Sequence, residues 1–260
     1  MSKKRKIIKK RRIKKSRLFI LALLVLIGIF SISFLVKNVF GNAKDNKVDD
    51  KNNVKEKTQQ NIEIEHLSLE NEKSNKKIKI LIDPGHGGSD TGSKGFSGSL
   101  EKDISLEIAK KVAGVLSQQK DLEVILTRSE DTNVSLEERT DMANSQNIDL
   151  VVSIHQNAQN GASSANGTET YYPQNGINDS DKLAKSIQDT ICLYLNTKNR
   201  GIYPSNVGIL KSTDMPTALV EVGFLTNEKD EKNLKSQSYQ NKMAEGIAQG
   251  ILSYIDSKHK

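Results

Sequence analysis

Between residues 77 and 255, short apolar runs alternate with longer segments in which apolar side chains recur every three or four positions. The short runs predict strands at residues 77–82, 122–126, 149–154, 168–172 and 218–222. The longer segments predict helices at residues 99–119, 135–145, 180–197 and 239–255, the second of which begins with the Ser-x-x-Glu spacing of a capping box. This alternation predicts an α/β fold, a single three-layer domain whose central, mostly parallel sheet is flanked by helices.

A different pattern precedes this domain. Residues 18–36 are 19 positions without a charged side chain, long enough as a helix to cross the roughly 30 Å hydrocarbon core of a bilayer. Residues 1–17 hold eleven Lys and Arg and no acid, which predicts a cytoplasmic basic segment before a transmembrane anchor. A signal peptide cleaved near residues 41–43 is the alternative. Both interpretations place the domain outside the cytoplasm, on a single-pass protein of the cell membrane or on a secreted protein.

Residues 37–76 predict a disordered polar linker. Sixteen of these forty residues are charged, so the segment has too little apolar surface to offset the entropy lost on ordering. One stretch, residues 61–69, alternates apolar and polar side chains, which fits either an edge strand or a less polar piece of linker. The folded domain is therefore expected to occupy residues 77–260.

The net charge of +7 is unevenly distributed along the chain. Of the 39 Lys and Arg, eleven lie in residues 1–17 and eight in residues 37–76, which leaves 20 for the domain against 24 Asp and Glu. A mildly acidic domain argues against a nucleic-acid partner. The single cysteine, Cys192, excludes an intramolecular disulfide, and its place between Ile191 and Leu193 predicts a small core residue.

Two histidines stand at the ends of predicted strands. His86 follows the first strand in a Gly-rich loop, and His155 ends the strand at residues 149–154. Because ligands of open α/β sheets bind at the carboxyl ends of the strands, both imidazoles are expected in one crevice. Two His and one carboxylate are a common zinc ligand set. Glu101 and Asp103, at the start of the next helix, are both candidates for the carboxylate, although acids there also favour the helix dipole.

Glu221 lies inside an apolar strand, in Ala-Leu-Val-Glu-Val. Burying a carboxylate costs several kcal/mol unless it is paired or linked to a metal. Glu221 is therefore expected to face the site, as the general base for a water activated by the metal.

Several blocks of the domain resemble, in order and spacing, the zinc-dependent N-acetylmuramoyl-L-alanine amidases of bacterial cell walls. These blocks read LIDPGHGG, SLEKD, VVSIHQNA, GTETYY and NVGILKSTDMPTALVEVGFLTN. The resemblance covers nearly all of residues 77–256 and implies hydrolysis of the amide between N-acetylmuramic acid and L-alanine in peptidoglycan. It implies one Zn²⁺ per chain, with His86, Glu101 and His155 as ligands and Glu221 as the catalytic residue.

Three other residues are assigned roles beside this ligand set. Asp83 and Asn157 are expected to hold the ligand imidazoles or to contact substrate. Gln156 stands where the family usually has a small residue, which implies an altered rim of the cleft.

The expected partners are peptidoglycan and, through the N-terminal helix, the membrane, with no sign of an obligate protein partner. Two other functions fit the same residues. One is a different zinc hydrolase on this fold, such as a peptidase or a deacetylase. The other is a membrane-tethered, non-catalytic module that binds peptidoglycan.

Overall fold

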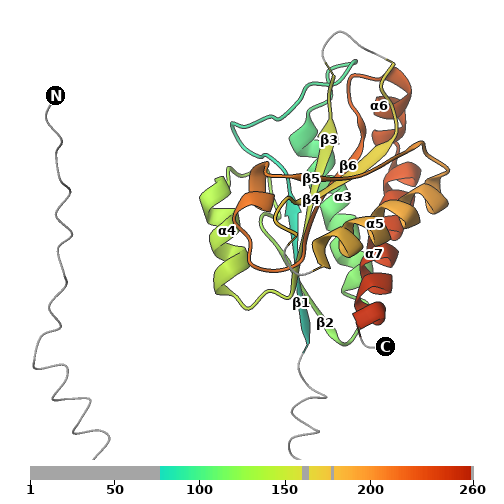
Figure 1. The fold of residues 1–260 in the computed structure, drawn as a ribbon. Helices are drawn as coiled ribbons and strands as arrows, with labels where there is room; N and C mark the ends of the chain where they lie inside the picture. Colours follow the sequence, from blue (N-terminus) through green and yellow to red (C-terminus); the bar gives the residue numbers. More distant parts are fainter. Residues whose placement is uncertain (1–76, 160–163, 177–178, 259–260) are drawn as a thin grey trace, which may run out of the picture. The chain divides into compact units, whose positions relative to one another are not determined.

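The structure is a computed structural model of the chain, and it describes residues 77–159, 164–176 and 179–258 (Figure 1). The predicted anchor, the predicted linker and the alternating stretch at residues 61–69 lie outside the described residues. Within the described ranges, every helix is too short or too polar to cross a membrane.

The described chain forms a six-stranded sheet in the order β2-β1-β3-β6-β4-β5. The strands are β1 (Ile78–Pro84), β2 (Leu122–Leu126), β3 (Leu150–Asn157), β4 (Thr168–Pro173), β5 (Asn199–Ser205) and β6 (Thr217–Phe224). Neighbouring strands run parallel except β4 and β6, which are antiparallel. The prediction of an α/β fold with a mostly parallel central sheet is confirmed.

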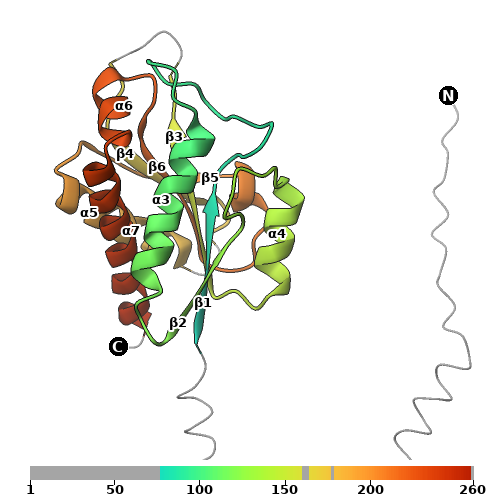
Figure 2. The same ribbon diagram turned by 180° about the vertical axis from the view of Figure 1, so that it is seen from behind.

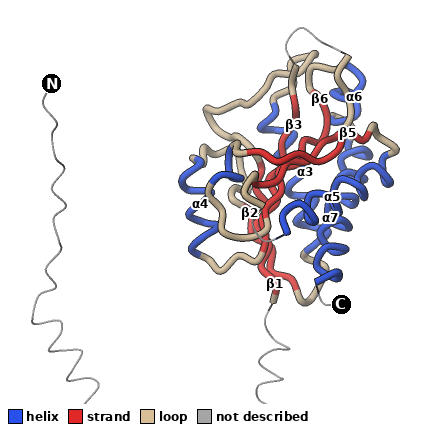
Figure 3. Tube along the Cα trace, in the orientation of Figure 1, coloured by secondary structure: helices blue, strands red, loops and turns tan. Residues whose placement is uncertain are grey.

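Helices cover both faces of the sheet, because alternate strand residues point to opposite sides. The larger core joins residues such as Ile80, Val152 and Val220 to three helices (Figure 2). These helices are α3 (Glu101–Leu116), α5 (Ser180–Leu195) and α7 (Gln237–Lys258). On the other face, Leu81 and Val151 pack with α4 (Leu136–Ser145) and the 3-10 turn η2 (Gly208–Lys211). Figure 3 shows the strands lying between these two groups of helices.

Side-chain caps begin two of the helices, α4 and α6 (Glu228–Leu234). The capping box before α4 forms as predicted, because Ser135 Oγ accepts from the backbone N–H of Glu138 at 3.2 Å and the Glu138 carboxylate accepts from the N–H of Ser135 at 2.8 Å. The short, highly polar α6 (Glu228–Leu234) was not predicted. Its cap is Asn227, whose side chain accepts from the backbone of the first turn.

Cys192 differs from its prediction as a core residue. It is only half-buried on α5, and its Sγ lies 3.5 Å from the hydroxyl of Thr168. Gln188, one turn earlier on α5, also reaches the sulfur. Cys192 therefore lies in a polar part of the contact between α5 and β4, because its neighbours there are a hydroxyl and an amide.

Candidate metal centre

The loop after β1 brings His86 into the crevice in an unusual backbone conformation. His86 has φ of 59°, which side-chain-bearing residues rarely adopt. Arg139 of α4 fixes this loop by donating to the carbonyl oxygens of Pro84 and His86, both at 2.7 Å. Gly85 gives room for His155, since a Cβ at Gly85 would lie 2.3 Å from the His155 ring. The loop is therefore held in position by hydrogen bonds to its backbone and by the absence of a side chain at Gly85.

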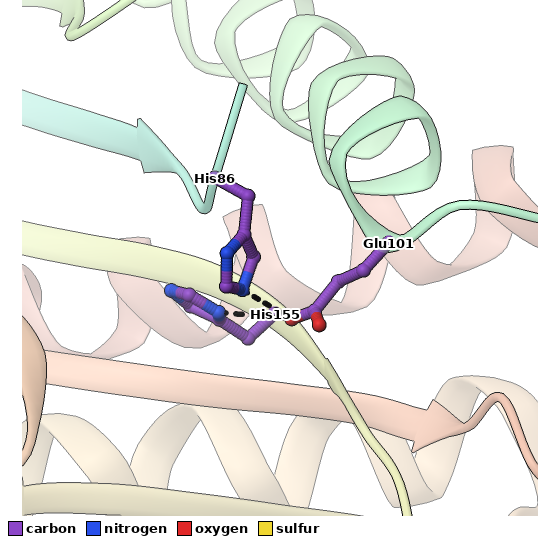
Figure 4. Close-up of side chains that lie close together, drawn as sticks. All are labelled: His86, Glu101 and His155. Atoms are coloured by element: carbon purple, nitrogen blue, oxygen red, sulfur yellow. Dashed lines mark hydrogen bonds and ion pairs between the residues drawn. The ribbon is translucent and has the colours of Figure 1, made fainter. Parts of the chain in front are cut away.

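The two imidazoles lie together, as predicted from the strand ends. Their ring centroids are 5.0 Å apart and the rings are almost perpendicular. Glu101, the first residue of α3, is 3% exposed and completes the group. Its Oε1 lies 3.1 Å from Nε2 of His86 and 3.0 Å from Nδ1 of His155 (Figure 4).

These three side chains have the geometry of a metal site. Each offers one ligand atom, and the three atoms lie within 4.8 Å of one another. Two imidazoles and one carboxylate match the ligand set of many zinc sites, which leaves further positions for water or substrate. Asp103, the other candidate carboxylate, is exposed on α3 and lies outside this group.

Hydrogen bonds hold the Glu101 carboxylate in its charged form. Burial alone would raise its pKa, but the hydrogen bonds and charges of His155 and His86 lower it well below the usual range. The backbone N–H groups of Ser93 and Gln156 donate to it at 2.8 and 3.1 Å. A carboxylate kept ionised in this way suits a cation, because a metal ligand must be deprotonated.

Asp90 orients the His86 ring. Its Oδ2 lies 2.9 Å from Nδ1 of His86, which turns Nε2 toward Glu101. Burial lowers the pKa of His86, but the hydrogen bonds to Glu101 and Asp90 outweigh it and raise this pKa to about 9. The sequence prediction missed Asp90. Its signal was an acid four residues after the histidine within the same Gly-rich loop.

Glu221 lies on β6, beside His155 in the parallel register of β3 and β6. Its Oε2 is buried and makes no hydrogen bond with the described residues. Burial raises the pKa of Glu221 to about 7, and the negative charges of Glu101 and Glu169 act in the same direction while His155 opposes them. The prediction that this carboxylate faces the site is therefore consistent with its surroundings.

Comparison with known proteins identifies the family. The sequence profile of the family described as N-acetylmuramoyl-L-alanine amidase matches residues 80–253, about two thirds of the chain. The chain belongs to the N-acetylmuramoyl-L-alanine amidase family. Among its relatives is N-acetylmuramoyl-L-alanine amidase LytC of Bacillus subtilis, 44% identical over 176 residues, which are 67% of this chain and 35% of LytC. The chain thus matches about a third of the length of LytC.

Solved structures of the amidase family share the fold. The N-acetylmuramoyl-L-alanine amidase of Clostridium difficile 630 has a TM-score of 0.69 and 43% identity, over 70% of this chain and 98% of that one. The catalytic domain of the amidase CwlV from Bacillus (Paenibacillus) polymyxa has a TM-score of 0.66 and 39% identity, over 69% and 98% of the two chains. The similarity thus extends over nearly the whole of each of these two structures.

In this amidase-family chain, Asp83 and Asn157 were expected to hold the ligand imidazoles or to contact substrate. Their hydrogen bonds in the structure go to other residues. Asp83 is buried in an ion pair with Arg139 and accepts from Thr127 and Ser153, each at 2.6 Å. Burial would raise the pKa of Asp83, but the Arg139 guanidinium and the two hydroxyls lower it. Asp83 thus anchors the residue that clamps the His86 loop.

The side-chain amides of Asn157 and Gln156 bind groups other than the imidazoles. The Asn157 amide donates to Glu169 at 2.5 Å. Gln156 is buried, and its amide points toward Ser105 of α3 at 3.3 Å. The expectation that Gln156 alters the cleft rim is therefore wrong, because consecutive residues of β3 face opposite sides of the sheet.

Proposed function

We propose that this protein is a zinc-dependent hydrolase that cleaves the amide between N-acetylmuramic acid and L-alanine in peptidoglycan. The observation that carries the proposal is the convergence of His86, Glu101 and His155 beside the buried carboxylate of Glu221. Membership of the amidase family supports the choice of bond and substrate. The same convergence gives no reason to prefer a binding module without catalysis.

His86, Glu101 and His155 are the residues that would hold one Zn²⁺ per chain. When bound, the ion supplies a Lewis acid for the amide carbonyl and lowers the pKa of a water toward 7. The chain supplies the rest of the site. Asp90 holds Nδ1 of His86 and so leaves Nε2 as the atom that would bind the ion, and the pair Asp83–Arg139 keeps the loop that carries His86 in place.

Glu221 is proposed as the general base and acid. It accepts the proton of the attacking water and then passes it to the nitrogen of the leaving L-alanine. A base works best when its pKa lies near the working pH, and the burial of Glu221 raises its pKa into that range. Its place on β6 beside His155 brings it to the side of the metal site opposite β1.

Substrate reaches the imidazoles from the α4 side of the sheet. A cavity of about 230 Å³ there is lined by both histidines and by residues at the start of α4, including Val134 and Leu136. Both histidines line this cavity and Glu221 does not, so a bound chain would extend from the cavity past the ligand group toward β6.

The proposed arrangement of the whole chain follows from the sequence. Residues 1–17 stay in the cytoplasm, residues 18–36 anchor the protein in the cell membrane, residues 37–76 form a linker, and residues 77–260 act on the wall outside. The charge asymmetry across the uncharged segment supports this topology. Protease added to intact protoplasts should remove the domain and spare a fragment of about the first 36 residues. Full protection of the domain would contradict the topology.

The proposed reaction is tested by incubating the purified protein with peptidoglycan sacculi. New amino termini should belong to L-alanine, appear only with metal, vanish on chelation and return with zinc. A peptidase would release other amino termini, and a deacetylase would release acetate. Either of these products without new L-alanine termini would refute the proposed function.

A further inference from the structure

A strip of charged and polar side chains leads from the metal ligands to the edge of the sheet. His155 on β3 is the register partner of Glu221 on β6, and Glu221 is the partner of Glu169 on β4. Glu169 forms an ion pair with Arg200 on the edge strand β5. Residues in register on neighbouring strands share one face of a sheet, so His155, Glu221 and Glu169 form one row on the face that carries α4, and the ion pair extends this row to Arg200.

The carboxylate of Glu169 is occupied by three hydrogen-bond donors. It is 4% exposed and accepts from Asn157 at 2.5 Å, from the Tyr171 hydroxyl at 2.8 Å and from Nε of Arg200 at 2.6 Å. Three donors take up most of the acceptor positions of one carboxylate. Its role is to hold Arg200.

The guanidinium of Arg200 is held at Nε and on one face, and its Nη1–Nη2 edge is free among the described residues. Nε is bound to Glu169, and the guanidinium carbon lies 4.7 Å from the centroid of the Phe224 ring. The side chain is still 29% exposed. Among the described residues, no hydrogen bond involves Nη1 or Nη2. The outer edge of the guanidinium therefore presents two parallel donors, the geometry that binds a carboxylate.

The surface beside this edge is polar and aromatic. Tyr203 on β5 is 44% exposed, and its ring lies 6.0 Å from that of Tyr171 on β4. The helix that packs on β4 and β5 is α5, which belongs to the opposite layer, and on the α4 side the short turn η2 contacts β4. The part of this face at the edge strand β5, where Arg200 is partly exposed, is thus available to an extended ligand.

We infer that Arg200, held by Glu169 and Phe224, binds a carboxylate of the peptidoglycan stem peptide and so selects substrates in which that carboxylate is free. The inference rests on the proposed function. Glu221 and Arg200 are separated by two strand spacings, roughly 10 Å. An extended peptide covers roughly 3.3–3.6 Å per residue, so the carboxylate belongs to the second or third residue of the stem.

The positions of the cavity and of Arg200 also indicate which part of the substrate lies on which side of the site. The cavity is lined by the start of α4, the loop after β1 and the turn η2, whereas Arg200 lies on the edge strand β5, beyond Glu221 in the sheet order. Because the carboxylates of the substrate are in its peptide part, the peptide runs toward β5. The muramic acid part then occupies the α4 side.

The test uses the purified protein and three muramoyl tripeptides. One has free carboxylates, and the others carry a carboxamide at the second or the third residue. The wild-type protein should cleave at least one amidated substrate with a kcat/KM roughly 10- to 100-fold lower, the usual value of a hydrogen bond to a charged group. Arg200→Gln should cleave all three at rates within about twofold of one another, whereas Arg200→Lys should keep part of the preference.

The readout is the ratio of kcat/KM between the free and the amidated substrates. A general loss of activity in Arg200→Gln lowers both values and leaves this ratio unchanged, so the ratio distinguishes recognition of the carboxylate from a merely structural role. Lys110→Gln, which removes an exposed charge on α3, is the matched control and should keep the wild-type ratio. Equal cleavage of the three substrates by the wild-type protein, or an unchanged preference in Arg200→Gln, would overturn the inference alone. Failure of the wild-type protein to cleave any muramoyl–alanine bond would overturn the proposed function and the inference together.

Discussion

Replacing Glu221 with Gln should make the metal-free protein more resistant to unfolding at alkaline pH. Burial raises the pKa of Glu221 from 4.5 to about 7, and Oε2 has no hydrogen-bond partner among the described residues. A raised folded-state pKa means that the folded protein holds this proton more tightly than the unfolded chain does. The stability that results is present below pH 4.5 and is lost as the pH rises through 7.

The size of the effect follows from the pKa difference. A shift from 4.5 to about 7 corresponds to about 3 kcal/mol, of which about 2.5 kcal/mol is lost between pH 5 and pH 8. Gln is neutral at both pH values and fills nearly the same volume. The wild-type protein should therefore lose about 2.5 kcal/mol more unfolding free energy over this interval than Glu221→Gln does.

The assay is urea unfolding of both proteins at the two pH values with the metal removed by chelation. His86, whose pKa is raised from 6.5 to about 9, also makes stability depend on pH, but it is present in both proteins, so the comparison between them tests Glu221. Zinc should reduce the difference, because a nearby cation lowers the pKa of a carboxylate. An identical pH dependence in the two chelated proteins would mean that Glu221 is not a buried, unpaired carboxylate, and its assignment as the base would fail.

Four further substitutions test the surroundings of the site. His86→Ala should lose zinc and activity together, measured as metal per chain and sacculus release, whereas Asp103→Asn should keep both because Asp103 lies outside the ligand group. Asp83→Asn should lower the unfolding free energy by about 3–5 kcal/mol in urea titrations, because it leaves the buried Arg139 guanidinium without a counter-charge. A loss below about 1 kcal/mol would contradict this role of Asp83. Gly92→Ala should weaken zinc binding in a competition assay. Gly92 has φ of 62°, and an added Cβ would lie 2.6 Å from the His86 ring. Unchanged zinc affinity would contradict the close fit of this loop around His86.

The strand ends could be predicted because local patterns determine them. His86 and His155 each follow an apolar run, and the parallel sheet brings the carboxyl ends of such runs together. Glu221 was recognisable because a carboxylate inside an apolar strand needs a special environment. These inferences required no knowledge of distant contacts.

The rest depends on contacts between distant segments. β5 was not predicted, because its sequence Asn-Arg-Gly-Ile-Tyr-Pro-Ser contains a Gly and a Pro and lacks apolar alternation. Such a sequence is tolerated at the edge of a sheet, where one side of the backbone needs no strand partner. The pairing of Arg200 with Glu169 depends on this unpredicted strand. The clamp of Arg139 on the His86 loop spans 53 residues, and nothing near either residue indicates it.

The central claim is that His86, Glu101 and His155 hold the metal while Glu221 carries the proton. The most direct test measures zinc per chain and the rate of L-alanine release from sacculi on the wild-type protein and Glu221→Gln. The account predicts that the variant keeps about one zinc and loses on the order of 10²–10⁴ in turnover. A variant that loses its zinc, or that keeps the wild-type rate, would contradict this division between ligands and base.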